Sequence, residues 1–388
     1  MKVAYRCSAL AFIAALSSVV LAQSQNPSAR VGLGRPVLSL IGVPVPYDPS
    51  ESILSGAQLV QDAPGRAAVI DTLQKSQRLS NVRLHAYDLK TSFTTYGSSS
   101  SDGRWILEDM SPGQDVYRWT AEGPSYSAVF LTIRKLLSSN HPGGAVPLRL
   151  AQVRSAIFGA FFPGIGPNAT LRVADGFVGG AALRCVLIAR NIEGDAPTAF
   201  TSGRSFGESE YCIDPKTLLL ELYSPAPGIY IHYDYSNAEH FHDTTIWNGF
   251  TITQGGKTII EARTDGVSDA PPPNSNLFQA AGLNTLGAGI VIEVPTLVRS
   301  IGTTATASGA QSSNAEVVVV HGVISPEGKL DEAEIIATTN PGFNQEAMDR
   351  AGRSFSLQRA TDVQPGAVEH PREIVFTEEF LPRPATQP

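Results

Sequence analysis

Between residues 83 and 263 apolar side chains recur mainly at every second position, which is the period of a β-strand. The first strand-like runs are LHAYDLKTSFTTY, RWILEDM, QDVYRWTAEG and SYSAVFLTIRK, with clusters of Gly, Ser and Pro between them. Further runs are ALRCVLIAR, SEYCIDP, TLLLELYS, GIYIHYDYS, EHFHDTTIW and KTIIEAR. This regular spacing predicts one antiparallel meander. A sheet this long must curl or close to protect its edges.

Two segments show helical spacing instead. Leu150, Val153 and Ile157 recur on one helical face and predict a helix that interrupts the strands. Glu51–Ser80 also spaces its apolar residues by three or more positions, and one or two short helices are expected there. The chain between residues 23 and 49 is rich in Pro and Gly and predicts an extended leader.

The C-terminal part predicts a small domain of its own. Glu316–Ser325 is a β-branched apolar run, and Lys329–Thr338 reads as its returning strand after a turn that contains Pro and Gly. Asn340 is a candidate helix N-cap, Gly352 is expected just past the helix, and Arg372–Phe380 reads as a last strand. The side chains expected to share a core are Val318, Val320, Ile324, Leu330, Ile335, Phe343 and Phe376.

This β-β-α-β order, with its VxGxIxPxGKLxEAxII…NPxxNxxAxxxA…F body, resembles the C-terminal domain of TonB, the periplasmic energy transducer of Gram-negative bacteria. The resemblance implies a protein-interaction module related to transmembrane transport, in which an outer-membrane or envelope protein adds a strand to an exposed edge. By resemblance the edge is the last strand, with Ile374, Phe376, Thr377 and Phe380 as partner-binding residues. TonB proteins carry a long Pro/Lys/Glu-rich spacer where this chain has a globular region, which casts doubt on direct energy transduction.

The strand-rich region more weakly resembles the half-barrels of LolA-like periplasmic lipoprotein carriers. The similar stretches are DLKTSF, which begins at Asp88, and EYCIDPKTL, which begins at Glu210. Such folds hold acyl chains on a concave sheet that a helix covers. The resemblance therefore implies a lipid or acyl chain as an alternative ligand. The expected cavity residues are Phe93, Trp105, Trp119 and Phe130. A filled interior, with ordinary aromatic packing, explains the same residues.

The N-terminus has the pattern of a secretory signal peptide. Lys2 and Arg6 precede an apolar run that ends at Leu21, and Val20 and Ala22 supply the small residues of a cleavage site. Cleavage after Ala22 would deliver the protein to the periplasm. The alternative is an uncleaved segment that anchors the chain in the inner membrane.

The composition of the 388 residues agrees with export. Only 17% of the residues are charged, and 35 Gly and 27 Pro indicate many turns. A net charge of −7 without a basic run gives no support to nucleic-acid binding. Beyond the signal region only Cys185 and Cys212 remain. They predict one disulfide in an oxidising compartment, with two separately buried thiols as the alternative.

No residue pattern indicates catalysis or a cofactor. His240 and His242 would lie on one face of a strand and could chelate a metal, but no third ligand is fixed nearby. Alternating polar residues on a solvated strand explain the pair equally, so we expect no metal site. A G-x-G-x-x-G motif is absent from the sequence, and the seven histidines have no recognisable nucleophile context for Ser/His/Asp hydrolysis. We therefore expect a protein that is not an enzyme.

These observations predict an α+β protein. A large curved antiparallel half-barrel with a covering helix is followed by a small TonB-like β-β-α-β domain. The expected divisions are a signal peptide at 1–22, a leader with short helices at 23–80, the half-barrel at 81–268, a linker at 269–313 and the TonB-like domain at 314–382. The mostly apolar linker contains the run IVIEVPTLV, which is expected to add a strand to either neighbour.

Overall fold

The computed structural model describes residues 54, 56–76, 85–97, 102–113, 115–141, 146–159, 169–178, 181–189, 204, 207–288, 296–300, 316–324, 330–357 and 372–380. The expected signal peptide at 1–22 and the leader up to residue 53 lie outside this part of the chain. No helix among the described residues is both long enough and apolar enough to cross a membrane.

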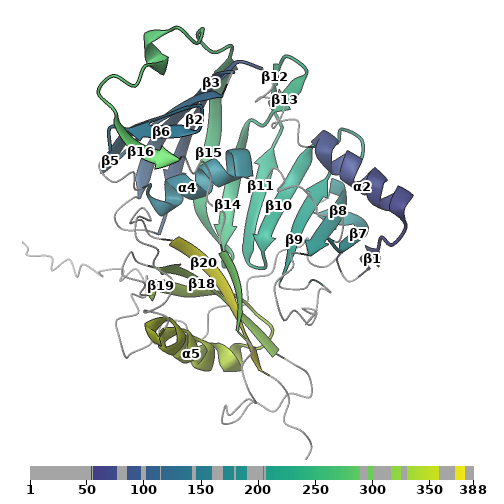
Figure 1. Ribbon diagram of the computed structural model, residues 1–388. Helices are drawn as coiled ribbons and strands as arrows, with labels where there is room; N and C mark the ends of the chain where they lie inside the picture. The colour runs from purple at the N-terminus through teal and green to yellow at the C-terminus, as the bar shows by residue number, and fades with distance from the viewer. Residues whose placement is uncertain are drawn as a thin grey trace, which may run out of the picture.

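Most of the described chain forms one open, curved antiparallel sheet (Figure 1). Its 14 strands, in spatial order, are β1 (Gln58–Leu59), β7 (Leu171–Val178), β8 (Ala181–Ala189), β9 (Glu208–Ile213), β10 (Leu220–Ala226), β11 (Ile229–Asp234), β14 (Gly249–Gln254), β15 (Lys257–Ser268), β2 (Tyr87–Thr95), β3 (Gly103–Gly113), β4 (Val116–Gly123), β5 (Tyr126–Ile133), β6 (Leu136–Ser139) and β16 (Asn284–Ala288). The sheet is not closed, because β1 and β16 form its two ends. The expected half-barrel is therefore present.

The sheet consists of two meanders rather than the single meander that was expected. Strands β2 to β6 follow one another, and strands β7 to β11 with β14 and β15 form the second series. The long strand β15 pairs with β2 from Ile260 opposite Thr95 to Ser268 opposite Asp88, and this pairing joins the two series. Sequence spacing identifies strands but carries no information on such a long-range pairing, which explains the error.

Two helices contribute side chains to the core on the concave face. These are α2 (Ala63–Ser76) and α4 (Leu148–Arg154), which continues into a π-helical turn, η3 (Ser155–Gly159). Leu150, Val153 and Ile157 are fully buried in that core, as their spacing predicts. In Figure 1, α4 lies in front of the sheet near β15 and β14. The covering helix that the sequence predicts is therefore α4.

The C-terminal residues form a four-stranded sheet in the order β17-β20-β18-β19. Its elements are β17 (Thr296–Ser300), β18 (Glu316–Ile324), β19 (Leu330–Thr338), a 3-10 turn η5 (Pro341–Phe343), α5 (Asn344–Leu357) and β20 (Arg372–Phe380). The Asn340 side chain accepts a hydrogen bond from the Gly342 N–H at 3.0 Å, as expected of a cap. Gly352 lies inside α5 rather than after it, because the helix runs on to Leu357.

One face of this small sheet packs on α5. The core there contains Val318, Val320, Leu330, Ile335, Phe343 and Phe376. The side chain of the seventh predicted residue, Ile324, lies outside the described part of the structure. The β-β-α-β order and its core were therefore predictable from periodicity alone.

The other face of the small sheet packs against the half-barrel. Val317, Val319, Ile336, Ala337 and Val375 belong to the same buried cluster as the side chains of the concave face. Polar contacts join the two parts as well: Gln254 Nε2 lies 3.1 Å from Nδ1 of His321 and donates a hydrogen bond to Glu334. Figure 1 shows the small sheet beneath the half-barrel, at the end where β10 turns into β11. The two sheets therefore share one core.

The expected linker at 269–313 is structural where it is described. Asn284–Ala288 forms β16 and pairs with β6 of the half-barrel, while Thr296–Ser300 forms β17 and pairs with β20 of the small sheet. The last three residues of the run IVIEVPTLV, from Thr296, thus belong to a strand that pairs with the C-terminal neighbour, while the first six lie outside the described residues. The Pro-rich start of this region continues into a short 3-10 turn, η4 (Asn276–Phe278), whose Phe278 is buried.

The expected free edge at the last strand is wrong. Strand β20 lies inside the sheet, with β18 antiparallel on one side and β17 parallel on the other. Thr377 faces both Val319 and Arg299, and its side chain is fully buried. The sequence predicted a strand in the linker but not its pairing with β20, and this pairing covers the expected edge.

Candidate functional site

The four aromatic residues expected to line a ligand cavity lie together on the concave face of strands β2 to β5. Phe93 stacks on Trp105 with ring centroids 5.7 Å apart, and Trp119 stacks on Phe130 at 4.1 Å. All four are at most 3% exposed. They come together because side chains at alternate strand positions share a face, and Phe93 opposes Trp105 just as Trp119 opposes Phe130.

Helix α4 covers part of this aromatic face and carries buried polar groups into it. Arg149, Gln152, Arg154 and Ser155 are all at most 8% exposed. The Arg149 guanidinium donates a hydrogen bond to the Gln152 side chain at 2.9 Å. A helix that served only as apolar core would not need such side chains, because burying charge costs free energy.

The Arg154 side chain is at the centre of this arrangement. Its guanidinium carbon lies 4.1 Å from the centre of the Trp119 ring and 5.9 Å from that of Tyr117, both within cation–π range. Its Nε lies 3.7 Å from a carboxylate oxygen of Asp109, and an Nη group donates a hydrogen bond to the Tyr117 hydroxyl at 3.0 Å. Tyr87 donates from its hydroxyl to the same carboxylate at 3.4 Å.

The surroundings of this group favour the protonated forms of Arg154 and Tyr117. Burial alone would lower the pKa of the Arg154 guanidinium, but the neighbouring Tyr117 and Asp109 outweigh it and the pKa is raised. Burial, followed by the negative charge of Asp109, raises the pKa of the Tyr117 phenol. Arg154 is therefore a cation and Tyr117 a neutral hydroxyl throughout the physiological range.

The sequence reading missed Asp109 and Arg154, although a signal for each was present. Asp109 shares the inward parity of Trp105 and Leu107 on strand β3, so the alternation alone places a carboxylate on an apolar face. Arg154 lies four residues after Leu150 on the helix, and therefore on its buried side.

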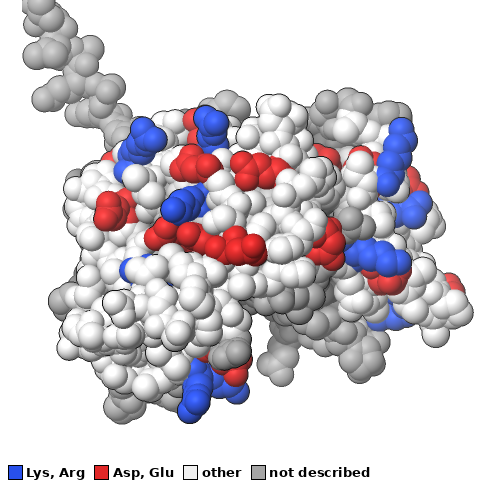
Figure 2. Space-filling model, turned by 90° about the horizontal axis from the view of Figure 1, so that it is seen from above, with Lys and Arg blue, Asp and Glu red and all other residues white. Residues whose placement is uncertain are grey.

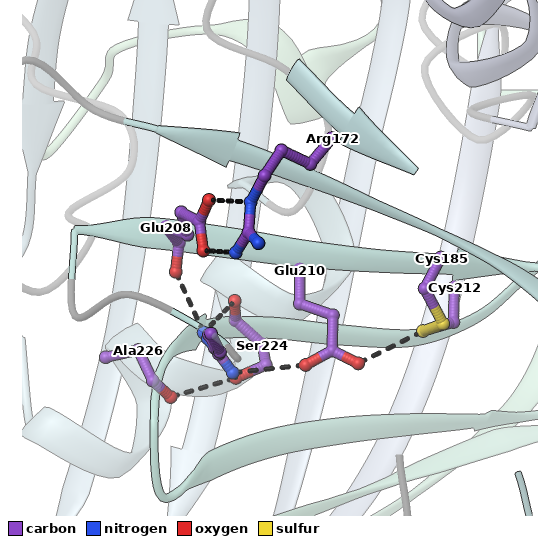
Figure 3. Close-up of polar contacts among 8 residues, drawn as sticks. Arg172, Cys185, Glu208, Glu210, Cys212, Ser224 and Ala226 are labelled. Atoms are coloured by element: carbon purple, nitrogen blue, oxygen red, sulfur yellow. Dashed lines mark hydrogen bonds and ion pairs between the residues drawn. A yellow bond between two sulfur atoms is a disulfide. The ribbon is translucent and has the colours of Figure 1, made fainter. Parts of the chain in front are cut away.

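A second buried polar network lies near strands β9 and β10 (Figure 3). Fully buried Arg204 donates hydrogen bonds to the Glu210 carboxylate at 3.1 Å and to the Ser224 hydroxyl at 2.8 Å. It also donates to the main-chain carbonyls of Glu208 and Ser224. Arg172 forms a two-pronged ion pair with Glu208 at 2.8 and 2.6 Å. The network fixes Arg204 onto the sheet.

The predicted cysteine pair adjoins this network. Cys185 on β8 and Cys212 on β9 oppose each other and are joined by a disulfide. A carboxylate oxygen of Glu210 lies 3.2 Å from the sulfur of Cys212 (Figure 3). These three side chains are the one group among the described residues whose atoms are close enough to hold a metal. Because the two cysteines form a disulfide and Arg204 pairs with Glu210, this group holds neighbouring parts of the sheet together by one covalent bond and one ion pair.

The histidines considered as metal ligands do not converge. His240 lies in the short strand β12 (Glu239–Phe241), whereas His242 lies in the turn before β13 (Thr244–Ile246) with a φ of 53°. Because the strand ends between them, the two rings do not share a face. His242 instead stacks on His85 at 4.6 Å and pairs with Asp269 at 2.8 Å.

The expected partner-binding residues of the last strand are interior. Ile374, Phe376 and Phe380 point into the core with α5, where Phe380 stacks on Phe343 at 4.5 Å. Thr377 points to the opposite face. The described outer strands of this sheet are β17 and β19.

Surface charge gives no basic field on the face seen in Figure 2. Lysine and arginine side chains lie among aspartates and glutamates there, and acidic groups form a band across the middle. Single ion pairs such as Arg184 with Asp175 at 2.8 Å are exposed. This face of the described residues thus offers no feature that would favour a nucleic acid.

The chain matches no protein-family model, and no curated protein matches it. Among solved structures it is similar to a LolA superfamily protein from Nitrosomonas europaea, with 8% identity and a TM-score of 0.36 over 53% of this chain and 94% of that one. A DUF1329 family protein from Desulfovibrio piger matches with 9% identity and a TM-score of 0.34, over 56% and 99%. LprF from Mycobacterium bovis matches with 14% identity and a TM-score of 0.23, over 54% and 97%. At this level of similarity nothing about function follows from the matches. The TonB resemblance rests on sequence pattern and element order alone.

Proposed function

We propose that this protein is a non-enzymatic binding protein of the bacterial envelope that holds an apolar ligand, such as an acyl chain, on the concave face of the half-barrel. The ligand takes the place that α4 occupies. The observation that carries the proposal is that the aromatic face under α4 is covered by a helix docked through buried polar groups, Arg149, Gln152 and Arg154.

Buried polar docking makes the helix exchangeable. Replacing a buried ion pair by apolar side chains is often neutral or stabilising, so the pair is a poor device for permanent packing. Removing α4 as a unit takes Arg154 to water, where its charge is well solvated, and uncovers the Trp119 ring on which its guanidinium lies. An acyl chain of comparable apolar area would then regain the free energy lost with the helix, at about 25 cal/mol per Å².

The small C-terminal domain has a structural part in this proposal. Its sheet shares a core with the half-barrel through Val317, Val319 and Ile336, so it closes one end of the concave face. Direct coupling to an energy-transducing motor has no support from this arrangement. Interaction with an envelope partner remains an independent proposal, for which β20 is not an available edge because it is paired on both sides.

The experiment is native mass spectrometry of protein purified from the periplasm without detergent. We expect a cleaved chain that begins after Ala22 and carries adducts whose masses fit acyl-containing molecules. Chloroform extraction should remove the adducts while the intact mass of the polypeptide stays unchanged. A ligand-free protein that also takes up no added fatty acid or monoacylglycerol would overturn the proposed function. A chain that retains residues 1–22 and fractionates with the inner membrane would replace the periplasmic location by the anchored alternative.

A further inference from the structure

The group around Arg154 has the composition of a binding site for an organic cation. Trp119 and Tyr117 present ring faces to the guanidinium at 4.1 and 5.9 Å, and Asp109 supplies a carboxylate at 3.7 Å. Phe130 backs the Trp119 ring in a near-parallel stack with an interplanar angle of 7°. Aromatic faces with one acidic group are the means by which proteins recognise ammonium ligands.

All groups of this cage other than the cation itself belong to the sheet. Asp109 on β3 opposes Trp119 on β4, which in turn opposes Phe130 on β5. Tyr117 lies two residues before Trp119 and so shares its face. Only Arg154 belongs to the helix. If α4 leaves the concave face, the cage stays in position and loses its cation.

Filling the cage with an uncharged group would be costly. Asp109 is fully buried, and an uncompensated carboxylate at such a site costs several kcal/mol in proteins. A ligand that displaces α4 must therefore bring its own positive charge, or leave this carboxylate without the partner that α4 supplies. An anionic ligand would place like charge beside Asp109.

We propose, building on the proposed function, that the ligand of the half-barrel is a cationic or zwitterionic amphiphile whose ammonium group replaces the Arg154 guanidinium between Trp119 and Asp109. Arg154 is the internal stand-in for that group. Its side chain occupies the site when no ligand is bound, and the apolar chain of the ligand lies along the aromatic face that α4 vacates.

Isothermal titration compares three amphiphiles of equal chain length, each below its micelle concentration: dodecyltrimethylammonium, dodecanol and dodecyl sulfate. We expect dodecyltrimethylammonium to bind at least about tenfold more tightly than dodecanol, which corresponds to about 1.4 kcal/mol. Dodecyl sulfate should bind most weakly. Equal binding of the cationic and neutral amphiphiles would overturn the cation site and leave the proposed function standing. No binding of any of the three would overturn both. A preference for dodecyl sulfate would show that Arg154 receives the ligand, and would also overturn the proposal.

Choline separates the two sources of an ammonium group. If the free cation raises the melting temperature at millimolar concentration, the cage takes small amines. If only the amphiphile does so, the cage reads a lipid headgroup. Both results support the cation site. If neither choline nor the amphiphile raises the melting temperature, the cation site is contradicted.

Two variants test the cage itself. Trp119→Leu should weaken binding of the cationic amphiphile more than binding of dodecanol, and so abolish the preference for the cation. Phe93→Leu, on the same face but outside the cage, should change the affinity for both amphiphiles alike and so leave their ratio unchanged. Arg154→Met removes the stand-in, and we expect its melting temperature to rise with added ethylguanidinium but not with neutral ethylurea. If Arg154→Met folds and ethylguanidinium has no effect, the guanidinium site is not accessible to an external cation and the proposal fails. If that variant does not fold, the Trp119→Leu comparison decides.

Discussion

Gly228 lies directly against the main chain of Ile336. A Cβ atom at Gly228 would stand 2.5 Å from the carbonyl oxygen of Ile336, closer than Cβ atoms approach other heavy atoms in proteins. Gly228 belongs to the turn between β10 and β11 of the half-barrel, whereas Ile336 belongs to β19 of the small sheet. This contact, across more than a hundred residues of sequence, is the plainest sign that the two sheets form one body.

The first prediction follows from this contact. Gly228→Ala should lower the free energy of unfolding by about 2–4 kcal/mol, because the residue has a φ of 89° and its new methyl group would meet backbone. Gly97→Ala is the matched control, since Gly97 has a φ of 85° and a methyl group added there would have nothing within 4 Å. Urea unfolding measures both variants. An equal loss of stability in the two variants would mean that backbone strain from the positive φ alone is responsible. It would also mean that the sheets are not in contact at Gly228.

The second prediction concerns the inner position of strand β20. Thr377→Pro should cost at least about 2 kcal/mol or prevent folding, because proline removes a ladder hydrogen bond and disturbs a strand that is paired on both sides. Thr377→Val keeps the N–H and the branched shape, and it should remain close to wild type. Circular dichroism and thermal melting of the full chain decide the point. A stable Thr377→Pro protein would restore the free-edge interpretation of the last strand.

The third prediction concerns the buried network at Arg204. Arg204→Met should cost about 3–5 kcal/mol, because it leaves the Glu210 carboxylate buried with its ion-pair partner removed. The double variant Arg204→Met with Glu210→Gln removes both charges and should be distinctly more stable than the single variant. Arg184→Met breaks an exposed ion pair with Asp175 and should cost no more than about 1 kcal/mol. Comparable losses in the three proteins would contradict the structural role of the buried pair.

The fourth prediction uses two aspartates whose pKa values shift in opposite directions. Hydrogen bonds from the Ser236 main chain and from Asn248 lower the pKa of Asp234 below its ordinary 3.8. The stabilisation from Asp234 is therefore present above pH 3.8 and is lost as the pH falls through the lower folded-state value. Burial, with the charge of Glu108, raises the pKa of Asp88, so ionised Asp88 opposes folding at neutral pH.

Urea unfolding at neutral pH and near pH 3 tests these signs. Asp234→Asn should destabilise the protein at neutral pH and flatten its loss of stability on acidification. Asp88→Asn should leave the stability at neutral pH unchanged or increased. The same sign for both variants at neutral pH would contradict the assignment of the two environments.

Much of this architecture could be predicted from local pattern. Alternation identified β2, β3, β4 and β5, and the spacing of Leu150, Val153 and Ile157 identified α4. The apolar parity of Val318 and Val320 identified the core under α5. These elements follow from the periodicity of single segments, and tertiary contacts did not override it.

Features that depend on distant pairing could not be predicted. The pairing of β15 with β2 and that of β17 with β20 leave no periodic signal, because either partner would alternate equally well beside another strand. The shared core between the sheets was missed for a related reason. Val317 and Val319 alternate with Val318 and Val320, so the continuous valine run showed that both faces are buried but not what covers the second one.

The candidate site was predicted in its apolar part and missed in its polar part. Aromatic residues at inward positions indicated Trp105 and Trp119, whereas Asp109 and Arg154 meet only when a helix some 45 residues further along the chain docks on the strand.

Tryptophan quenching by a brominated, uncharged ligand is the decisive measurement for apolar binding, because Trp105 and Trp119 lie on the concave face itself. A dibrominated monoacylglycerol is titrated into the delipidated protein, and fluorescence is compared with that of the variant Trp119→Phe. We expect saturable quenching at about one ligand per chain, with a smaller quenched amplitude in the variant. Binding that leaves tryptophan emission unchanged would place the ligand elsewhere on the molecule and would contradict a binding site on the concave face.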